Sequence, residues 1–268
     1  GSFIAAGTSH ANGGPPMVPL FFFYSMFGFQ RVGDLIWAAG DARARGFLIG
    51  ATSGRTTLAG EGLQHQDGHS HLLAHPHPSV RAYDVAYGYE LTTLVEDGLR
   101  RMLVDGVEEL VYLTVANEPY PMPAEPSGVR DGIRRGLYPI APEPEADVTL
   151  LGAGSLLRAA LEARAILAED YELRAEVLSV TSFSQLARDA AATERWNRLH
   201  PTATPRTSHL RATVGDRPRP FVAVSDWVSD LARLIAPALP GALRALGTDG
   251  YGRSDTREQL RSFFEVDR

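Results

Sequence analysis

The chain has 268 residues, of which 44% are hydrophobic and 22% are charged, a composition typical of a globular protein with one or two domains. Its net charge of −6 argues against nucleic acid as a partner. There is no cysteine, and all 26 basic residues are arginine, which excludes thiol catalysis, cysteine-based metal sites and lysine Schiff-base chemistry. The longest apolar run, residues 18–29, is too short to span a bilayer.

The first half of the chain alternates predicted strands with predicted helices. After the tail of a helix at residues 3–7 and a turn at 11–16, apolar runs predict buried strands at residues 18–24, 47–49, 80–83 and 109–115. Apolar residues at helical spacing predict amphipathic helices at residues 29–45 and 87–105. Gly46 is expected to end the first helix as a C-terminal cap. This alternation predicts a parallel sheet with helices on both faces.

A proline-rich segment from Pro119 to Pro144 predicts a boundary between two domains. We expect a first domain over residues 1–126 and a linker over residues 127–146, with a short helix near 129–135. The second domain is then expected over residues 147–268.

The second half repeats the alternation of strands and helices. Strands are predicted at residues 148–151, 175–180 and 221–224, and helices at 156–170, 184–198 and 228–235. The turn at residues 247–254 opens a last helix, where Asp255 and Glu258 have the spacing of a capping box. The turn Gly152-Ala153-Gly154 lacks the third glycine of a dinucleotide fingerprint, because Leu157 stands in its place. We therefore exclude a Rossmann cofactor site.

A long polar loop beginning at Thr52 separates the second and third predicted strands. It carries five of the eight histidines: His65, His69, His71, His75 and His77. Loops at the carboxyl ends of strands in α/β proteins are where binding and catalysis concentrate. A loop so rich in imidazole therefore favours proton-transfer chemistry.

Two other interpretations of this loop remain open from its residues alone. His65, His69 and His71 have a compact spacing that could hold zinc, although no cysteine is available and the loop lacks a clear helical pattern. A nucleophilic triad could combine Ser53 or Ser70 with a histidine and Asp67. No Gly-x-Ser-x-Gly elbow supports that triad.

The sequence resembles the homodimeric bacterial pyruvate dehydrogenases in two stretches, Thr52 through His71 and Phe22 through Arg31. These enzymes are the thiamine-diphosphate-dependent, decarboxylating first components of the pyruvate dehydrogenase complex. The resemblance continues at Asn117–Pro119, Val180–Phe183, Glu194–Pro201 and Gly247–Asp255. It spans essentially the whole chain and identifies it as part of such an enzyme. The implied fold is the C-terminal part of a parallel-sheet pyrimidine-binding domain followed by a transketolase C-terminal-like α/β domain.

The resemblance also implies roles for individual residues. Tyr24 and Phe27 match positions beside the aminopyrimidine ring, and aromatic faces suit a flat heterocycle. His65 matches an active-site histidine that binds the substrate carboxylate or stabilises the reaction intermediate, and Glu61 matches its polar neighbour. His71 resembles the histidine of the transketolase-type Asp-Gly-Pro-Thr-His signature, with His69 in place of proline.

The family anchors its cofactor diphosphate through a divalent metal, Mg2+, with a Gly-Asp-Gly motif and a following asparagine, and activates the pyrimidine with a glutamate. No Gly-Asp-Gly occurs in this chain, and the glutamate is expected just before Phe3. The diphosphate and metal site is therefore expected outside this chain, and the chain by itself is expected to be inactive.

The resemblance implies oxidative decarboxylation of pyruvate and transfer of the acetyl group to a lipoyl domain of the dihydrolipoamide acetyltransferase component. It also implies a cytoplasmic homodimer that binds neither membrane nor nucleic acid. Another 2-oxo acid dehydrogenase, a transketolase-like ketol transfer and a non-catalytic assembly module remain as alternatives. With its active-site wall uncovered, the chain is expected to self-associate through the apolar segment 21–29.

Overall fold

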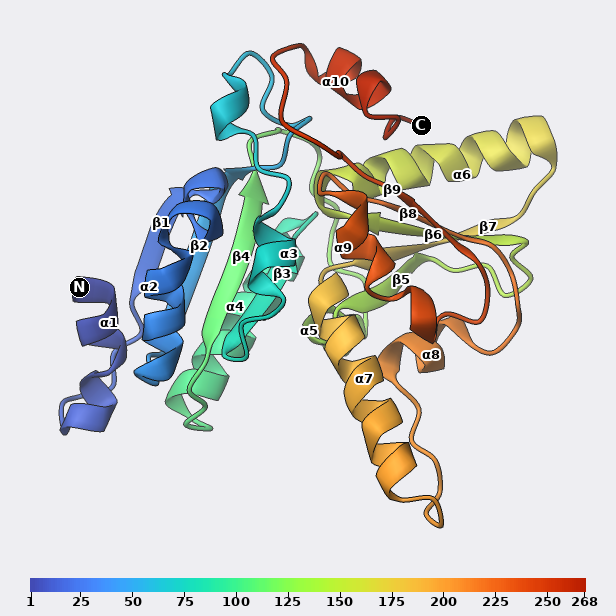
Figure 1. Ribbon diagram of the computed structural model, residues 1–268. Helices are drawn as coiled ribbons and strands as arrows, with labels where there is room; N and C mark the ends of the chain where they lie inside the picture. Colours follow the sequence, from blue (N-terminus) through green and yellow to red (C-terminus); the bar gives the residue numbers. More distant parts are fainter.

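The computed structural model describes residues 1–268 and contains two β-sheets that lie side by side (Figure 1). The first sheet has the strand order β1-β2-β4-β3, and the second has the order β5-β7-β6-β8-β9. Each sheet carries helices on its faces. The predicted α/β class is therefore confirmed in both halves of the chain.

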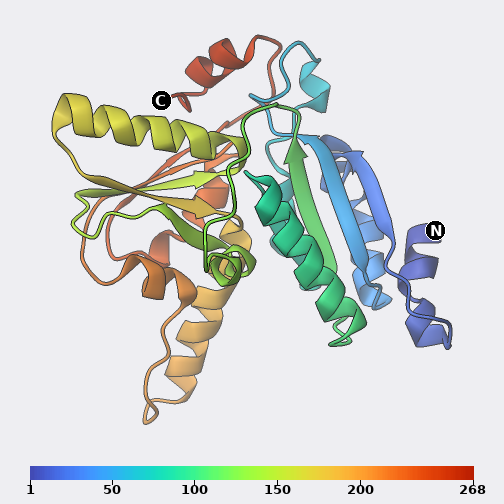
Figure 2. The same ribbon diagram turned by 180° about the vertical axis from the view of Figure 1, so that it is seen from behind.

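All strand pairs of the first sheet are parallel. Its strands are β1 (Leu20–Tyr24), β2 (Gly46–Ser53), β3 (Val80–Asp84) and β4 (Leu110–Ala116). Helix α2 (Phe29–Asp41) lies on one face and helix α4 (Gly88–Leu103) on the other, as the two opposite views show (Figures 1 and 2). The central strands β2 and β4 are buried on both faces, which explains their nearly continuous apolar sequences. The shorter helices of this half are α1 (Ser2–Gly7), η1 (Ser9–Asn12), η2 (Ser25–Phe27), η3 (Leu63–His65) and α3 (Ser70–Ala74).

The second sheet is parallel except for β5, which pairs with β7 in the antiparallel direction. Its strands are β5 (Leu137–Ala141), β6 (Val148–Ala153), β7 (Ala175–Val180), β8 (Phe221–Val224) and β9 (Leu243–Leu246). One face packs on α6 (Leu157–Tyr171), and the other packs on the cluster formed by α7 (Phe183–Leu199), α8 (His209–Val214) and α9 (Ser229–Arg233). The remaining helices are α5 (Arg130–Arg135), η4 (Gly154–Leu156), η5 (Ala236–Ala238) and α10 (Arg257–Phe263).

The first predicted strand forms, but the prediction that it is buried is wrong. Strand β1 is the edge strand of its sheet and pairs only with β2. Leu20 and Phe21 are exposed, and Phe22 is 65% exposed. Its apolar run indicated burial, but the sequence alone could not show that no part of this chain covers the strand.

The helix predicted for residues 29–45 ends earlier, at Asp41. Ala42 caps it, and Arg43 makes the turn with a left-handed φ of 63°. Gly46 is therefore not the cap; it begins β2. A Cβ at Gly46 would lie 2.8 Å from the carbonyl oxygen of Pro19, so glycine is required there by the close approach of two strands.

The segment 127–146, expected as a linker, contains α5 and β5. Strand β5 is an edge strand, the position in a sheet where Pro139 is tolerated because only one side of the strand needs hydrogen bonds. The last helix is capped by Thr256, whose side chain accepts a hydrogen bond from the Gln259 amide, and not by Asp255. The short elements α8 and β9 were not predicted.

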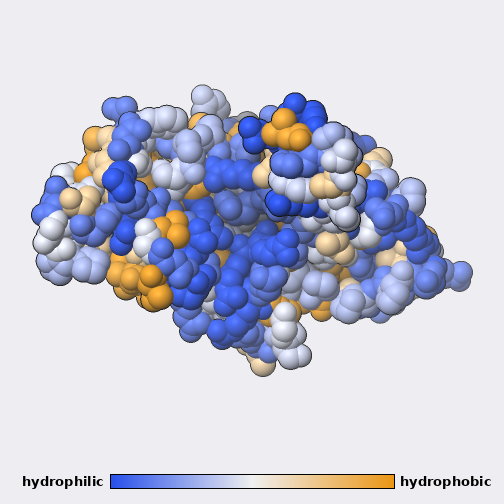
Figure 3. All heavy atoms as spheres, turned by 90° about the horizontal axis from the view of Figure 1, so that it is seen from below, coloured by the Kyte–Doolittle hydropathy of each residue, from blue (hydrophilic) through white to orange (hydrophobic).

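The two halves share a packed interface. One apolar cluster joins Ala86 and Tyr87 of the first half to Leu150 and Leu157 of the second. Another places Tyr138 of β5 beside Tyr83 of β3. None of the helices combines the length and apolar character that crossing a membrane requires. The face seen from below is mostly hydrophilic, with apolar atoms in separate patches (Figure 3).

Candidate active site

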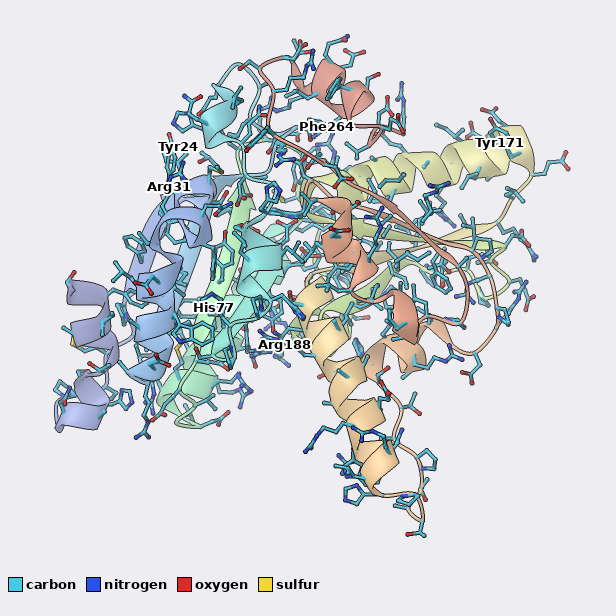
Figure 4. All side chains as sticks on the ribbon, viewed as in Figure 1. Tyr24, Arg31, His77, Tyr171, Arg188 and Phe264 are labelled. Atoms are coloured by element: carbon cyan, nitrogen blue, oxygen red, sulfur yellow. The ribbon has the colours of Figure 1, made fainter.

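Three aromatic side chains predicted to form the site lie together at the carboxyl end of β1. Tyr24 ends that strand, Phe27 lies in η2, and His65 comes from η3 of the long loop. The His65 ring centroid is 5.2 Å from that of Tyr24 and 5.6 Å from that of Phe27. Tyr24 is 42% exposed and lies at the surface beside the loop (Figure 4). The cluster is therefore an open aromatic wall, able to contact a flat ring.

Glu61 lies beside His65, as predicted. Its carboxylate oxygen is 3.4 Å from His65 Nδ1, within ion-pair distance. The geometry does not make a hydrogen bond, and Nδ1 has no other partner. Both side chains are about one-third exposed. An imidazole with a nearby carboxylate and an accessible ring can hold or transfer a proton.

His71 is in the core and does not join this cluster. Its side chain is 3% exposed, its Nε2 lies 2.8 Å from Thr114 Oγ1, and its ring packs edge-on against Trp227. Thr114 in turn donates to Asp84, whose other oxygen accepts from the Trp227 indole. Burial lowers the pKa of His71 to about 3, so the ring is neutral near pH 7.

The remaining loop histidines make separate contacts. His69 Nδ1 lies 3.1 Å from the Arg55 guanidinium. The backbone carbonyls of His75 and His77 accept hydrogen bonds from Arg188 of α7, at the boundary between the two halves (Figure 4). No group of three or more His, Asp or Glu side chains is placed to hold a metal ion. The zinc interpretation of the loop therefore has no matching cluster.

The triad interpretation finds no matching geometry either. The Ser70 hydroxyl bonds to Tyr112, and its amide donates to Asp67. Thr57 donates its hydroxyl to the Ser53 carbonyl. No serine hydroxyl of the loop forms a hydrogen bond with a histidine.

An acidic residue of the second half, which the sequence analysis did not single out, holds the start of the loop. Asp226, just after β8, accepts hydrogen bonds from the backbone amides of Arg55, Thr56 and Thr57. Gly54, with a φ of 86°, turns the backbone so that these amides converge on one carboxylate. Burial raises the pKa of Asp226 to about 6, so the carboxylate is mostly ionised at neutral pH. Its position after a predicted strand was the only signal in the sequence.

The chain is similar to known proteins along its whole length. The family described as pyruvate dehydrogenase E1 component middle domain matches residues 1–123, and the transketolase-like C-terminal domain family matches residues 136–267. The chain is 50% identical over 271 residues to a pyruvate dehydrogenase E1 component of Pseudomonas aeruginosa, which covers 100% of this chain. It is 51% identical over 270 residues to that of Escherichia coli K12, covering 99% of this chain.

The chain belongs to the pyruvate dehydrogenase E1 component family. It spans 31% of the Pseudomonas relative and 30% of the Escherichia relative. The family resemblance read from the sequence is thereby confirmed.

Solved structures show the same fold at low sequence identity. A transketolase from Leishmania mexicana superposes with a TM-score of 0.69 at 15% identity, covering 94% of this chain and 32% of the transketolase. A split-gene transketolase, described as an inactive beta4 tetramer, superposes with a TM-score of 0.68 at 14% identity and covers 99% of this chain and 77% of its own. These structures support the transketolase-like architecture of both halves.

Proposed function

We propose that this segment forms the pyrimidine-facing wall of the active site of a pyruvate dehydrogenase E1 component. The whole protein would decarboxylate pyruvate on thiamine diphosphate and transfer the acetyl group to the lipoyl domain of an acetyltransferase partner. One observation carries the proposal: Tyr24, Phe27 and His65 meet at the carboxyl end of β1, in a chain about half identical to E1 components along its whole length. A homodimer, with the second wall supplied by other parts of the protein, is part of this proposal.

The residues present fit one part of the cofactor. The exposed ring of Tyr24 and the half-buried ring of Phe27 offer apolar faces for a flat aminopyrimidine. Thiamine diphosphate, when bound, supplies the carbanion that adds to the carbonyl carbon of the oxo acid. The acidic side chains of this chain form no cluster suited to Mg2+. We therefore assign only the ring-facing wall to this segment, and the metal and diphosphate to the rest of the protein.

His65 is proposed as the catalytic residue of this wall. Its ring is accessible and carries an unpartnered nitrogen beside Glu61. A protonated imidazole there can bind the carboxylate of pyruvate or stabilise the negative charge that develops during the reaction. His71 is buried and neutral, and we propose that it positions Thr114 and the neighbouring strand end without touching substrate.

The test is His65→Ala in a full-length E1 protein that contains this segment. Pyruvate-dependent reduction of an artificial electron acceptor, measured with thiamine diphosphate and Mg2+, is expected to fall about 100-fold in kcat. His200→Ala, at an exposed histidine beyond α7, is the matched control and should keep full activity. Wild-type turnover in the His65 variant would refute the site assignment.

Substrate choice is tested with the same protein. Pyruvate should be preferred over longer 2-oxo acids, and ketol donors should give no turnover. The isolated 268-residue chain should show no pyruvate-dependent turnover, because the aromatic wall is open to solvent on its outer side. Activity with a ketol donor in place of pyruvate would favour the transketolase-like alternative.

A further inference from the structure

The segment Gly247–Asp255 is one of the stretches that carry the family resemblance, yet none of its residues belongs to the aromatic wall. It follows β9 and runs beside the long loop, at the top of the molecule in Figure 1. We call residues 247–257 the strap. The bonds from the strap to the loop involve Thr248, Arg253, Ser254, Asp255 and Arg257. The strap therefore binds the loop along most of its length.

Three of these bonds hold the loop backbone near Glu61, a fourth holds the Gln66 side chain, and the bond of Thr248 holds the Arg55 side chain. The Ser254 hydroxyl donates to the carbonyl oxygen of Glu61 at 2.9 Å. The Gly60 amide donates to the carbonyl of Asp255 at 3.4 Å. Arg257 donates to the carbonyl of Thr57 at 3.0 Å. The loop backbone at Thr57, Gly60 and Glu61 is thus held from the second half of the molecule.

Gln66, the residue after His65, is the centre of this arrangement. Its side chain is only 2% exposed. The amide oxygen accepts from the Arg253 backbone amide at 2.6 Å, and the amide nitrogen donates to the Leu58 carbonyl at 3.1 Å. One side chain therefore ties the strap to the loop and closes the loop on itself.

The strap approaches so closely that it requires glycine. A Cβ at Gly252 would lie 2.7 Å from Gln66 Cβ and 2.9 Å from the Leu63 carbonyl oxygen. Any larger residue would push the strap away from η3, which carries His65. This close contact accounts for the glycine at position 252 of the motif.

We propose that Gln66 and the strap are the positioning device for Glu61 and His65. The proposal rests on the proposed function of His65. Glu61 and His65 are joined to each other only by an ion-pair contact without hydrogen-bond geometry. Their placement against Tyr24 is therefore set by the backbone at Gly60 and Glu61 and by the Gln66 side chain, all of which the strap holds. Gln66 is a positioning residue, since its amide bonds point to Leu58 and Arg253 and not toward the aromatic wall.

The decisive experiment is a double-mutant cycle in a full-length E1 protein containing this segment. Gln66→Met keeps the length of the side chain and removes both hydrogen bonds. It should lower kcat for pyruvate about 10-fold with little change in KM, because a misplaced catalytic group loses transition-state stabilisation. In the His65→Ala background, Gln66→Met should cause no further loss of kcat, since its effect acts through His65. An equal 10-fold loss in both backgrounds would overturn the proposal.

Two further variants serve as a matched control and as an independent test of the strap. Gln185→Met makes the same chemical change in α7, where the amide nitrogen has no partner, and should leave kcat unchanged. Ser254→Ala removes a single bond at an exposed position and should lower kcat about 2- to 3-fold, so it tests the strap even if Gln66→Met folds poorly. Full activity in Ser254→Ala and Gln66→Met together would contradict the proposal.

Hydrogen exchange separates this proposal from the proposed function. In the 268-residue chain, Gln66→Met should increase amide exchange at residues 58–66 at least about 10-fold, with β2 and β4 unaffected. Unchanged exchange in that loop would refute the positioning role. If exchange increases while His65→Ala keeps wild-type turnover, the strap holds the loop but the assignment of His65 is wrong.

Discussion

His65 and His71 lie in the same loop and have opposite environments. His65 is about one-third exposed and is surrounded by rings and one carboxylate, with no hydrogen bond to its ring. His71 is 3% exposed, bonds to Thr114 and packs against Trp227. The contacts that fix the His71 side chain all come from this chain. The exposed region is contacted by this chain on only one side, as the proposed shared active site requires.

The buried region is a polar seam between the two halves. Asp84 of β3 accepts from Trp227, Asp226 accepts from three loop amides, and Glu90 of α4 accepts from Tyr138 and Ser179. Each carboxylate accepts at least one hydrogen bond from the opposite half, and Asp84 and Glu90 also accept from donors on their own half. Because a buried acceptor without donors is costly, each acid fixes how the two halves meet.

The largest expected effect is from removing the acid that holds the loop. Asp226→Ala would leave three buried backbone amides without acceptors, and we expect it to lower the free energy of unfolding by about 3 kcal/mol. Urea unfolding of the 268-residue chain, followed by circular dichroism, measures this. Asp230→Ala, at an exposed acid on α9, is the control and should change stability by less than about 0.5 kcal/mol. Equal stability of the two variants would show that the seam does not depend on this carboxylate.

The two histidines provide the next test. His71→Ala removes a buried ring and its bond to Thr114 and should cost about 2 kcal/mol of stability. His65→Ala removes a part-exposed ring and should cost less than about 0.5 kcal/mol in the same chain. The order reverses for activity, where His65→Ala is the more damaging. If the two substitutions had equal effects on unfolding, the contrast between the two environments would be wrong.

Sequence patterns located most strands and helices of this fold correctly. The apolar runs at β2, β4, β6 and β7 are strong because these strands are buried on both faces. The same kind of run at β1 indicated burial that the chain does not provide. Strand β5 was missed because Pro139 and the prolines outside the strand indicated a linker, although an edge strand tolerates a proline. Burial by distant parts of a protein cannot be read from a local pattern.

The family motif located Tyr24, Phe27, Glu61 and His65 correctly as neighbours in space. The motif did not show that His71 is in the core, because a polar loop sequence does not reveal which of its residues turns inward. Asp226 was not predicted, since a single aspartate after a strand has many possible roles. Its role depends on loop amides distant in the sequence.

An effect of similar size is expected from pH. Burial raises the pKa of Asp84 to about 7, and the nearby Asp226 and Glu90 charges add to this. The folded state therefore holds the Asp84 proton more tightly than the unfolded chain, where the pKa is near its ordinary value of 3.8. The contribution of protonated Asp84 to the free energy of unfolding is greatest at low pH and is lost as pH rises toward 7. Between pH 5 and 7 this loss is about 2 kcal/mol.

The measurement compares urea unfolding of the chain and of Asp84→Asn over that pH range. The variant should lose about 2 kcal/mol less stability than the wild type. His71 acts in the opposite direction. Its pKa is lowered from 6.5 to about 3 in the folded chain, so its contribution to stability is complete above pH 6.5 and is lost as pH falls toward 3. This contribution is common to both proteins and cancels in the comparison. Parallel pH profiles would show that Asp84 does not titrate in this range.

The smallest effect on the folded chain is expected at the edge strand β1, where the consequence is association. Leu20, Phe21 and Phe22 are exposed beside Tyr24, and an unpaired edge strand with apolar side chains favours pairing with another chain. We expect the 268-residue chain to self-associate at micromolar concentration, as measured by light scattering.

Phe22→Lys should change the free energy of unfolding by less than about 0.5 kcal/mol, because the ring is 65% exposed. It should also abolish association, because a lysine on an edge strand opposes pairing. Leu199→Lys, which adds the same charge at an exposed residue ending α7, should leave association unchanged. A wild-type chain that stays monomeric and binds no hydrophobic dye would show that the open side of the wall needs no partner.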